Sequence, residues 1–335
     1  MPELPAELLL LAPLALAAGI DLYLTLLLIG AAPTTPWWDH PLPGALGDLD
    51  SPGVLLVVGT FYLLEFLAER VAPAGLLWNA FHAAIRPVAG ALLALLLLDG
   101  AELPVALAGA VLAGTLISLA HAVRSGGSVV RWLGSTTSPH VLLVSLLEDA
   151  IVLGLVVLAL DAPRWALGVS AGLALFAVVA LPSHARAFGF AVRLTAARAL
   201  KTLTHRRWMG PEEIPPWVRR ALESDILAPG GGLRGSPAGA HRLPGAPRFT
   251  TGWIVIRGGS PLFVFPRNFL PVRAGGAARW VDVGPLKGER VVEAGFFHRV
   301  DLRTEAGAPA CVFFGVDGPS VESLRTEFVL APTGA

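Results

Sequence analysis

Two adjacent acids stand in the middle of an apolar segment of the chain. Glu148 and Asp149 interrupt the run SPHVLLVSLLEDAIVLGLVVLAL, which extends from Ser138 to Leu160. About 20 apolar residues cross a hydrocarbon core of about 30 Å, so these two carboxyl groups fall near mid-membrane. A charge at that depth costs roughly 2.5–3.5 kcal/mol and normally faces the bundle interior, where it marks a pathway or a binding site. The segment therefore predicts a polar centre inside a membrane domain.

Three further ionisable residues fall at comparable depths. Asp21 lies within the first apolar segment, and Glu65 and Arg86 lie in the second and third. We predict that these three residues form the intramembrane polar centre together with Glu148 and Asp149. Because a buried carboxylate needs a cation, we expect at least one of Glu148 and Asp149 to lie near Arg86. The alternative is a purely structural ion pair beside a carboxyl group that stays protonated.

Residues near this centre predict how the helices are shaped. Pro87 removes an intrahelical hydrogen bond and Gly90 lets a neighbouring helix approach, so we expect a kink that lines a cavity. The Gly- and Ser-rich stretch from Arg124 to His140 is interpreted as a cytoplasmic loop, with a short re-entrant segment as the alternative. The candidates for an inner-side gate or for anion contacts are His121, Arg124 and Arg131. The small residues predicted to allow close helix packing are Gly109, Ala113, Gly114, Ser118, Gly168 and Gly172.

The composition is that of an integral membrane protein. The 335 residues are 54% hydrophobic and only 15% charged, with a mean hydropathy of +0.65. The single cysteine excludes an internal disulfide framework and cysteine-based metal clusters. Six transmembrane helices are predicted, over residues 8–31, 53–68, 76–98, 103–123, 139–160 and 164–182. The first segment lacks the basic leader of a signal peptide, so it is interpreted as a retained span.

The basic residues are distributed unevenly between the two sides of this bundle. The loops after the first and third segments carry no Lys or Arg, whereas the opposite side is rich in arginine. By the positive-inside rule, both termini are expected in the cytoplasm and the protein in the cell membrane as a multi-pass protein.

A short sequence repeat suggests internal duplication. SPGVLLV from Ser51 reappears as SPHVLLV from Ser138, and each copy is followed by an intramembrane acid. Two units of three spans would be an inverted repeat. A chance match is the alternative, since Leu and Val dominate the membrane segments.

Beyond the membrane domain of residues 1–183, the composition changes twice. Residues 184–227 mix Arg with aromatic and aliphatic residues, which predicts a basic amphipathic juxtamembrane helix, with anionic lipids near Arg186 to Arg207, and a short second helix. Residues 228–248 are rich in Gly and Pro and are interpreted as a flexible linker. Residues 249–330 carry short alternating segments that predict a small all-β cytoplasmic domain, a barrel or a sandwich. The basic and aromatic residues of this domain are interpreted as a solvated surface, and the alternative is a face that binds lipid headgroups or nucleic acid. These residues are Arg267, Phe269, Arg273, Arg279, Trp280 and Arg299.

Three segments together carry a family resemblance. They are AAGIDLYLTLLLIG, LLEFLAERVAPAGLLWNAFHAAIRPVAGALLA and SPHVLLVSLLEDAIVLGLVVLALDAP. Over residues 4–183 the chain resembles the bacterial membrane proteins grouped as domain-of-unknown-function family 4126. The matching positions are Gly19, Tyr23, Glu65, Arg86, Pro87, Gly90, Glu148 and Asp149, and Asp21 departs from the expected pattern. The resemblance implies the architecture and brings no activity with it.

The expected function follows from the charges and not from a catalytic motif. The chain has no phosphate-binding loop, no nucleophile elbow and no HExxH zinc motif, and no cofactor is expected. The leading hypothesis is a transporter or channel-like protein for a small solute, ion or proton. The alternative is a non-transporting membrane scaffold or lipid-binding protein whose β domain recruits a protein partner, and a membrane enzyme ranks third. No nucleic-acid partner is expected.

Overall fold

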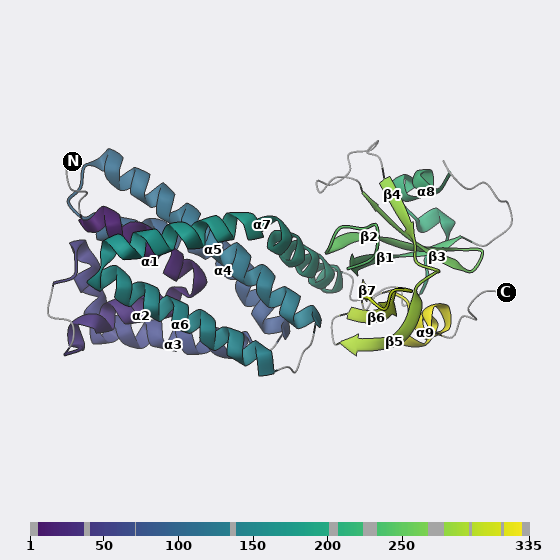
Figure 1. Cartoon of the computed structure of the whole chain (residues 1–335), viewed down its shortest axis with the longest axis horizontal. Coiled ribbons are helices and arrows are strands. Elements are labelled where there is room, and N and C mark those ends of the chain that lie inside the picture. Colours follow the sequence, from purple (N-terminus) through teal and green to yellow (C-terminus); the bar gives the residue numbers. More distant parts are fainter. Residues whose placement is uncertain are drawn as a thin grey trace. The chain divides into compact units, whose positions relative to one another are not determined.

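The chain forms two compact units, Met1–Phe188 and Gly189–Ala335 (Figure 1). The computed structural model describes residues 6–36, 41–70, 72–134, 139–200, 207–223, 233–266, 278–294, 297–315 and 318–329. Within these ranges, nothing is described of the side chains of residues 6, 72–73, 130–134, 139–141, 193–200, 223 and 294.

The first unit is a bundle of apolar helices. Its elements are α1 (Ala6–Ile20), α2 (Leu22–Ala31), η1 (Ala32–Thr34), η2 (Gly44–Asp50), α3 (Pro52–Ala68), α4 (Ala72–Leu97), α5 (Leu103–Gly134), α6 (Pro139–Asp161) and the first part of α7 (Pro163–Leu200). The residues of α7 from Gly189 onward belong to the second unit. In the described part of the chain, four helices, α4 to α7, are long and apolar enough to cross a membrane. The bent pair η2–α3 would make a fifth, with an angle of 80° between its two helices. The structure therefore supports a multi-pass membrane protein but not the six continuous spans predicted.

The first predicted span is broken at Asp21. This residue has an extended backbone, with φ −139° and ψ 107°, between α1 and α2. Its carboxylate accepts a hydrogen bond from the Leu24 backbone N–H at 2.9 Å, so Asp21 is the N-cap of α2. Aspartate is among the strongest N-cap residues, and this explains why a costly acid stands inside an apolar segment. α1 and α2 are each too short to span a membrane alone.

Two helices run further than their apolar segments. α5 continues to Gly134, so much of the predicted loop from Arg124 is helical, while residues 135–138 lie outside the described residues. Gly126 allows this extension, because a Cβ there would clash with the backbone of His184 on α7. α7 likewise continues past Pro182 to Leu200. The loop prediction failed here because Gly126 serves helix packing, while Ser125 and Ser128 hydrogen-bond within α5.

Close packing of α4 on α5 uses two of the predicted small residues. A Cβ at Gly90 would lie 3.0 Å from the carbonyl oxygen of Ala113, and one at Gly114 would lie 2.9 Å from that of Pro87. α4 runs as one helix through Pro87, and the kink expected there stays a prediction. A Cβ added at Gly168 or Gly172 would meet no atom within 4 Å, so the packing role predicted for them is not seen among the described residues.

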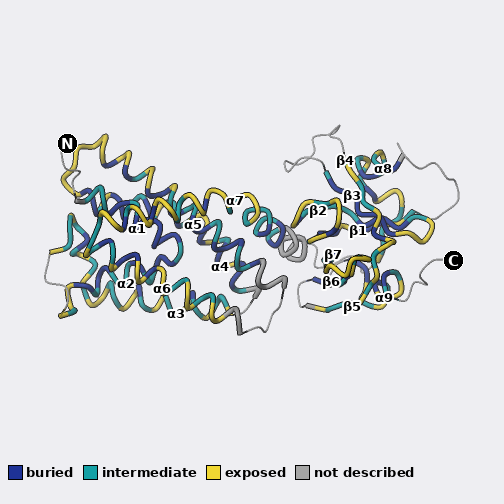
Figure 2. The backbone as a smooth tube through the Cα atoms, viewed as in Figure 1, coloured by how far each residue is buried: buried dark blue, intermediate teal, exposed yellow. Residues whose placement is uncertain are grey.

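The outer surface of the helical unit is apolar. Leu56 and Val179 are each 73% exposed, and similar residues project from α3 to α7. Figure 2 shows exposed positions along these helices and buried positions on their inner sides. Apolar side chains that face outward in this number are typical of helices in contact with lipid tails.

The second unit is built on one antiparallel sheet. Its strands are β1 (Arg234–His241), β2 (Thr250–Arg257), β3 (Ser260–Pro266), β4 (Ala278–Asp282), β5 (Lys287–Ala294), β6 (Phe297–Arg303) and β7 (Pro309–Gly315), in the order β4-β3-β2-β1-β7-β6-β5. The helices are η3 (Pro211–Glu213), α8 (Pro216–Glu223) and α9 (Val321–Phe328). Ile254 and Ile256 pack with α9, whereas Val255 packs with α8, so the two helices cover opposite faces of the sheet. The sheet is open, with β4 and β5 at its edges, so the predicted barrel or sandwich is corrected.

The predicted linker of residues 228–248 contains the central strand β1. β1 pairs with β2 on one side and with β7 on the other. Its small residues resemble a linker, but they are needed for packing, because a Cβ at Gly239 would overlap the ring of Phe190. Pro237 pairs only toward β2, since the ladder with β7 begins at Ala238.

Candidate functional site

The break at Asp21 is joined to the fully buried Arg86 on α4. One terminal nitrogen of Arg86, Nη1, donates to the backbone carbonyls of Ala18 (3.2 Å), Gly19 and Ile20 (3.4 Å). These carbonyls belong to the last turn of α1, where the break removes their helical partners. A cation at a helix C-terminus is also stabilised by the helix dipole. Arg86 therefore compensates the polar backbone that Asp21 leaves exposed inside the bundle.

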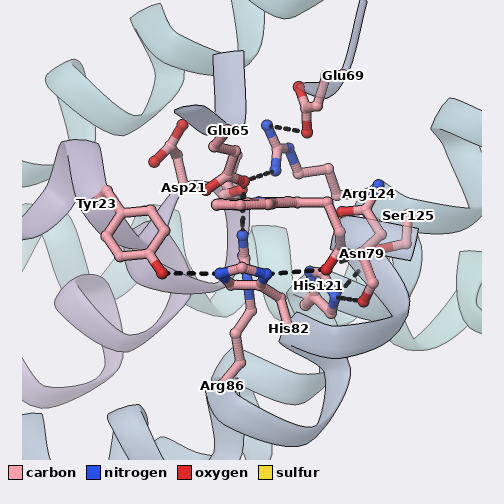
Figure 3. Close-up of polar contacts among 12 residues, drawn as sticks. Asp21, Tyr23, Glu65, Glu69, Asn79, His82, Arg86, His121, Arg124 and Ser125 are labelled. Atoms are coloured by element: carbon pink, nitrogen blue, oxygen red, sulfur yellow. Dashed lines mark hydrogen bonds and ion pairs between the residues drawn. The ribbon is translucent and has the colours of Figure 1, made fainter. Parts of the chain in front are cut away.

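Glu65 neutralises Arg86 and joins it to a second arginine. The Oε1 atom of Glu65 accepts from Nη2 of Arg86 at 2.9 Å and from Nη1 of Arg124 at 2.6 Å. The side chain of Glu65 is only 1% exposed. Figure 3 shows its carboxylate between the two guanidinium groups. One oxygen thus takes both cations, and the second oxygen, Oε2, is buried without a hydrogen-bond donor in the described structure.

Arg124 on α5 connects three carboxylates from two other parts of the bundle. Its Nη1 contacts Glu65, its Nη2 lies 2.8 Å from Glu69, and its Nε lies 3.1 Å from Glu148 on α6. The side chains of Glu69 and Glu148 are 15% and 17% exposed, so the network passes from a dry interior toward the surface. The ion pairs join three carboxylates to two guanidiniums, which is an excess of one acid over the arginines of the network.

A second polar chain lies beside the ion pairs and is built on two histidines. Nδ1 of His82 donates to the Trp78 carbonyl at 2.9 Å, and in the neutral ring Nε2 accepts from the Tyr23 hydroxyl at 2.8 Å. Nε2 of His121 donates to the backbone carbonyl of Asn79 at 3.0 Å (Figure 3). Each histidine satisfies a neighbouring carbonyl, so both rings help to hold α4 against α2 and α5.

The structure brings together most of the residues predicted for the polar centre. Asp21, Glu65 and Arg86 lie within it, as does Glu148. Asp149 accepts instead from the hydroxyl of Tyr62 at 3.2 Å, at the side of the network.

One expected pairing is corrected: Glu148 contacts Arg124, whereas Arg86 was expected to be its partner. The reason is that Arg86 is turned toward the α1 carbonyls. The role of Arg124 as an inner-side gate or in anion contacts stays a prediction. The side chain of Arg131 lies outside the described residues.

The sequence reasoning missed several members of the cluster. Glu69 follows Glu65 by four residues, and His82 precedes Arg86 by four residues, spacings that place each pair on one helix face. This spacing was the available signal. Nothing in the sequence indicated Asn79 or the Tyr62 contact, since both depend on a neighbouring helix.

The cluster contains groups of the kind that bind and release protons. It contains carboxylates and neutral imidazoles, and no group of three or more His, Cys, Asp or Glu in the described residues could hold a metal ion. In the β unit, Arg299 pairs with Asp301 at 2.8 Å, Arg279 is exposed on the edge strand β4, and Arg267, Phe269 and Arg273 lie outside the described residues. The described part of that surface does not form a comparable site.

Comparison with known proteins gives a family and no activity. A family model described as "Domain of unknown function (DUF4126)" matches residues 8–183, which include every residue of the polar cluster. No curated protein and no solved structure matches the chain at a significant level. Since the match covers more than half of the 335 residues, the chain belongs to the family of this domain of unknown function, DUF4126.

Proposed function

We propose that this protein transports a small ion or solute across the cell membrane through the polar cluster around Glu65. The single observation that carries the proposal is that the break in the first apolar segment coincides with the buried charges. Arg86 contacts the α1 carbonyls at this break and Glu65 at the same time.

The physical argument starts from what the cluster costs. Buried charges in a membrane domain are expensive, and a stable bundle does not require them. Helices that are interrupted at mid-membrane leave backbone polar groups free, and in secondary transporters such half-helix ends line the substrate and ion sites. Asp21 creates such an interruption, and Arg124 leads from it to the partly exposed Glu69 and Glu148. The arrangement suits a path from one surface to a mid-membrane site.

We place the protein in the membrane with both termini in the cytoplasm, on the Lys and Arg distribution. This orientation needs an even number of membrane crossings. The number is six if α1 and α2 together form one crossing, the bent pair η2–α3 forms another, and α4 to α7 form four. The Ser-Pro starts of α3 and α6 are the basis for a three-plus-three inverted repeat, which stays a hypothesis. Ser51 caps α3 and α6 starts at Pro139, so shared helix-start signals account for part of the similarity. Reporter fusions after Ala335 should be active in the cytoplasm, and an external C-terminus would contradict this orientation.

Access of water to the cluster separates transport from a dry structural core. In a Cys311→Ser background, Thr25→Cys places a thiol in the turn after the break, where Thr25 is fully buried. We expect a small membrane-impermeant thiol reagent to label this variant in native vesicles. Ala94→Cys, fully buried in the apolar core of the same unit, is the matched control and should stay unlabelled.

An unlabelled Thr25→Cys variant would favour the alternative function. In that alternative the cluster only holds the helices together, and the protein is a membrane scaffold or lipid-binding protein. Its β unit would then recruit a partner, with anionic lipids contacting Arg186 to Arg207.

A further inference from the structure

We propose that Asp21 and Glu65 share a single exchangeable proton, carried by Asp21, and that this proton is the coupling ion of the transport site. The inference rests on the proposed function and names the ion that the site takes. It depends on the hydrogen bonds of two buried carboxyl groups (Figure 3).

The first step is that the two acids lie close together in a dry environment. Asp21 is 3% exposed and Glu65 is 1% exposed, and Figure 3 shows both side chains in the same buried cluster. Arg86 contacts Glu65 and also the carbonyl of Ile20, the residue directly before Asp21. Two carboxylates that interact in a low dielectric do not both stay ionised unless enough cations surround them.

The second step is the division of cations between them. Both guanidiniums, from Arg86 and Arg124, bind Oε1 of Glu65, which favours the ionised form of that acid. The hydrogen-bond partner of Asp21 is the Leu24 backbone N–H, which donates to Oδ1. The proton of the pair therefore belongs on Asp21, whose Oδ2 is available to carry it.

The third step is the buried acceptor on Glu65. Oε2 of Glu65 has no hydrogen-bond donor within the described residues, and such burial is unfavourable because nothing replaces the hydrogen bonds that the oxygen would make to water. In the proposed state, the O–H group of a neutral Asp21 donates to this oxygen. One proton thus satisfies the acceptor and removes the repulsion between the two acids.

The proton cycle is balanced without any other reactant. On loading, one proton from water forms the O–H bond of Asp21. On release, that bond breaks and the proton returns to water, leaving two carboxylates beside the two arginines. The titratable and charged groups that face the pair are Tyr62 and Glu69 on or after α3, His82 and Arg86 on α4, His121 and Arg124 on α5, Glu148 and Asp149 on α6, and Tyr23 on α2. We assign the onward transfer of the proton to Glu69 and Glu148, whose side chains are 15% and 17% exposed and which both contact Arg124.

Infrared spectroscopy of the full chain in lipid nanodiscs tests the proposal directly. At neutral pH we expect the C=O stretch of a neutral carboxylic acid, and we expect Asp21→Asn to abolish it. Asn keeps an oxygen for the Leu24 N–H and an amide donor for Glu65, so this variant should fold. Asp21→Ser is the second variant, because serine also caps a helix but cannot carry the proton. Asp149→Asn is the matched control, since its carboxyl accepts from Tyr62, and it should leave the band unchanged.

Three results would overturn the proposal. They are a wild-type protein without a neutral-acid band at neutral pH, a band that survives in both Asp21 variants, and a band that Asp149→Asn removes. The test is separate from transport: an unlabelled Thr25→Cys variant beside an Asp21-dependent band would reject the proposed function and keep the shared proton. A labelled Thr25→Cys variant without the band would reject the proton and keep the transport path.

Discussion

The two units of this protein place their charges in opposite ways. In the helical unit, Arg86 is fully buried and pairs with the buried Glu65, while leucines and valines face outward. In the β unit, large apolar clusters lie beneath α8 and α9, and ion pairs such as Arg290–Asp301 lie at the surface, with Arg290 68% exposed.

The difference shows what an ion pair does in each environment. At a water-exposed surface, a pair contributes about 0–1 kcal/mol, since both partners are well solvated when separated. Inside a bundle, removal of one partner leaves a buried charge and costs far more. The helical unit therefore has a buried polar cluster in addition to its apolar core, whereas the β unit depends mainly on apolar contact for its interior. The predictions below test this contrast, from the largest expected effect to the smallest.

The largest loss of stability should come from a β-unit fragment that lacks α8, because α8 contributes to the apolar core. Ile214, Val218 and Leu222 pack under the sheet although they precede the predicted linker. Each such side chain contributes about 1.5–3 kcal/mol, against a total stability of about 5–15 kcal/mol for a domain. A fragment Gly189–Ala335 should unfold cooperatively in circular dichroism, whereas Leu233–Ala335 should be unfolded. Equal stability of the two fragments would show that α8 lies outside the cooperative core.

The next largest effect should come from Glu65→Gln in the helical unit. This change removes the shared carboxylate of Arg86 and Arg124, and we expect a loss of about 3–5 kcal/mol. The free energy of unfolding can be measured by SDS titration in mixed micelles. The matched control is Glu289→Gln, whose partner Arg303 is at the surface of the β unit, and it should leave the unfolding midpoint unchanged. A midpoint equally insensitive to Glu65→Gln would remove the contrast between the units.

Substitution of two glycines by alanine should change stability by smaller amounts and in opposite directions. The sign of the change shows whether the helix surface at each glycine is packed or faces lipid. Gly114→Ala places a Cβ 2.9 Å from the Pro87 carbonyl oxygen and should cost about 1–3 kcal/mol. Gly168→Ala meets no atom within 4 Å and should stabilise its helix by about 0.5–1 kcal/mol. The same SDS titration measures both changes, and a loss at Gly168 comparable to that at Gly114 would show that α7 packs on a neighbour at this point.

The smallest loss of stability is a pH dependence of the β unit at His241. Burial, together with Arg242 and Arg248, lowers the pKa of His241 from 6.5 to about 4. The unfolded chain then binds a proton at a higher pH than the folded unit. Stability is therefore complete above pH 6.5 and falls as the pH drops toward 4. With allowance for solvent around the ring, we expect a loss of about 1–2 kcal/mol over this window.

Thermal unfolding of fragment Gly189–Ala335 between these pH values measures the His241 effect. In the wild-type fragment the stability should fall between pH 6.5 and pH 4, and His241→Gln should abolish this fall. An unchanged slope in this variant would assign the pH dependence to another group.

Several predictions from the sequence depended on properties that a single segment carries. The apolar segments of α4 to α7 were identified because length and hydropathy are local, and the β strands were found because alternation is local. Gly90 and Gly114 were predicted as packing residues, and they are. The same reasoning failed for β1, whose small residues resemble a linker until Phe190 and the neighbouring strands are present.

By itself, the sequence determined that this is a multi-pass membrane protein with an appended β unit, and that costly charges in its apolar segments mark the polar centre. Only the tertiary structure decided how those charges are paired. Arg86 was free to pair with any acid at its depth, and the α1 carbonyls exposed by Asp21 determined its orientation. Glu148 pairs with Arg124 instead, because α5 places that arginine between α3 and α6. The depth of a charged residue in the membrane follows from its position along one helix. Its ion-pair partner depends on how separate helices face each other, and no single segment encodes that.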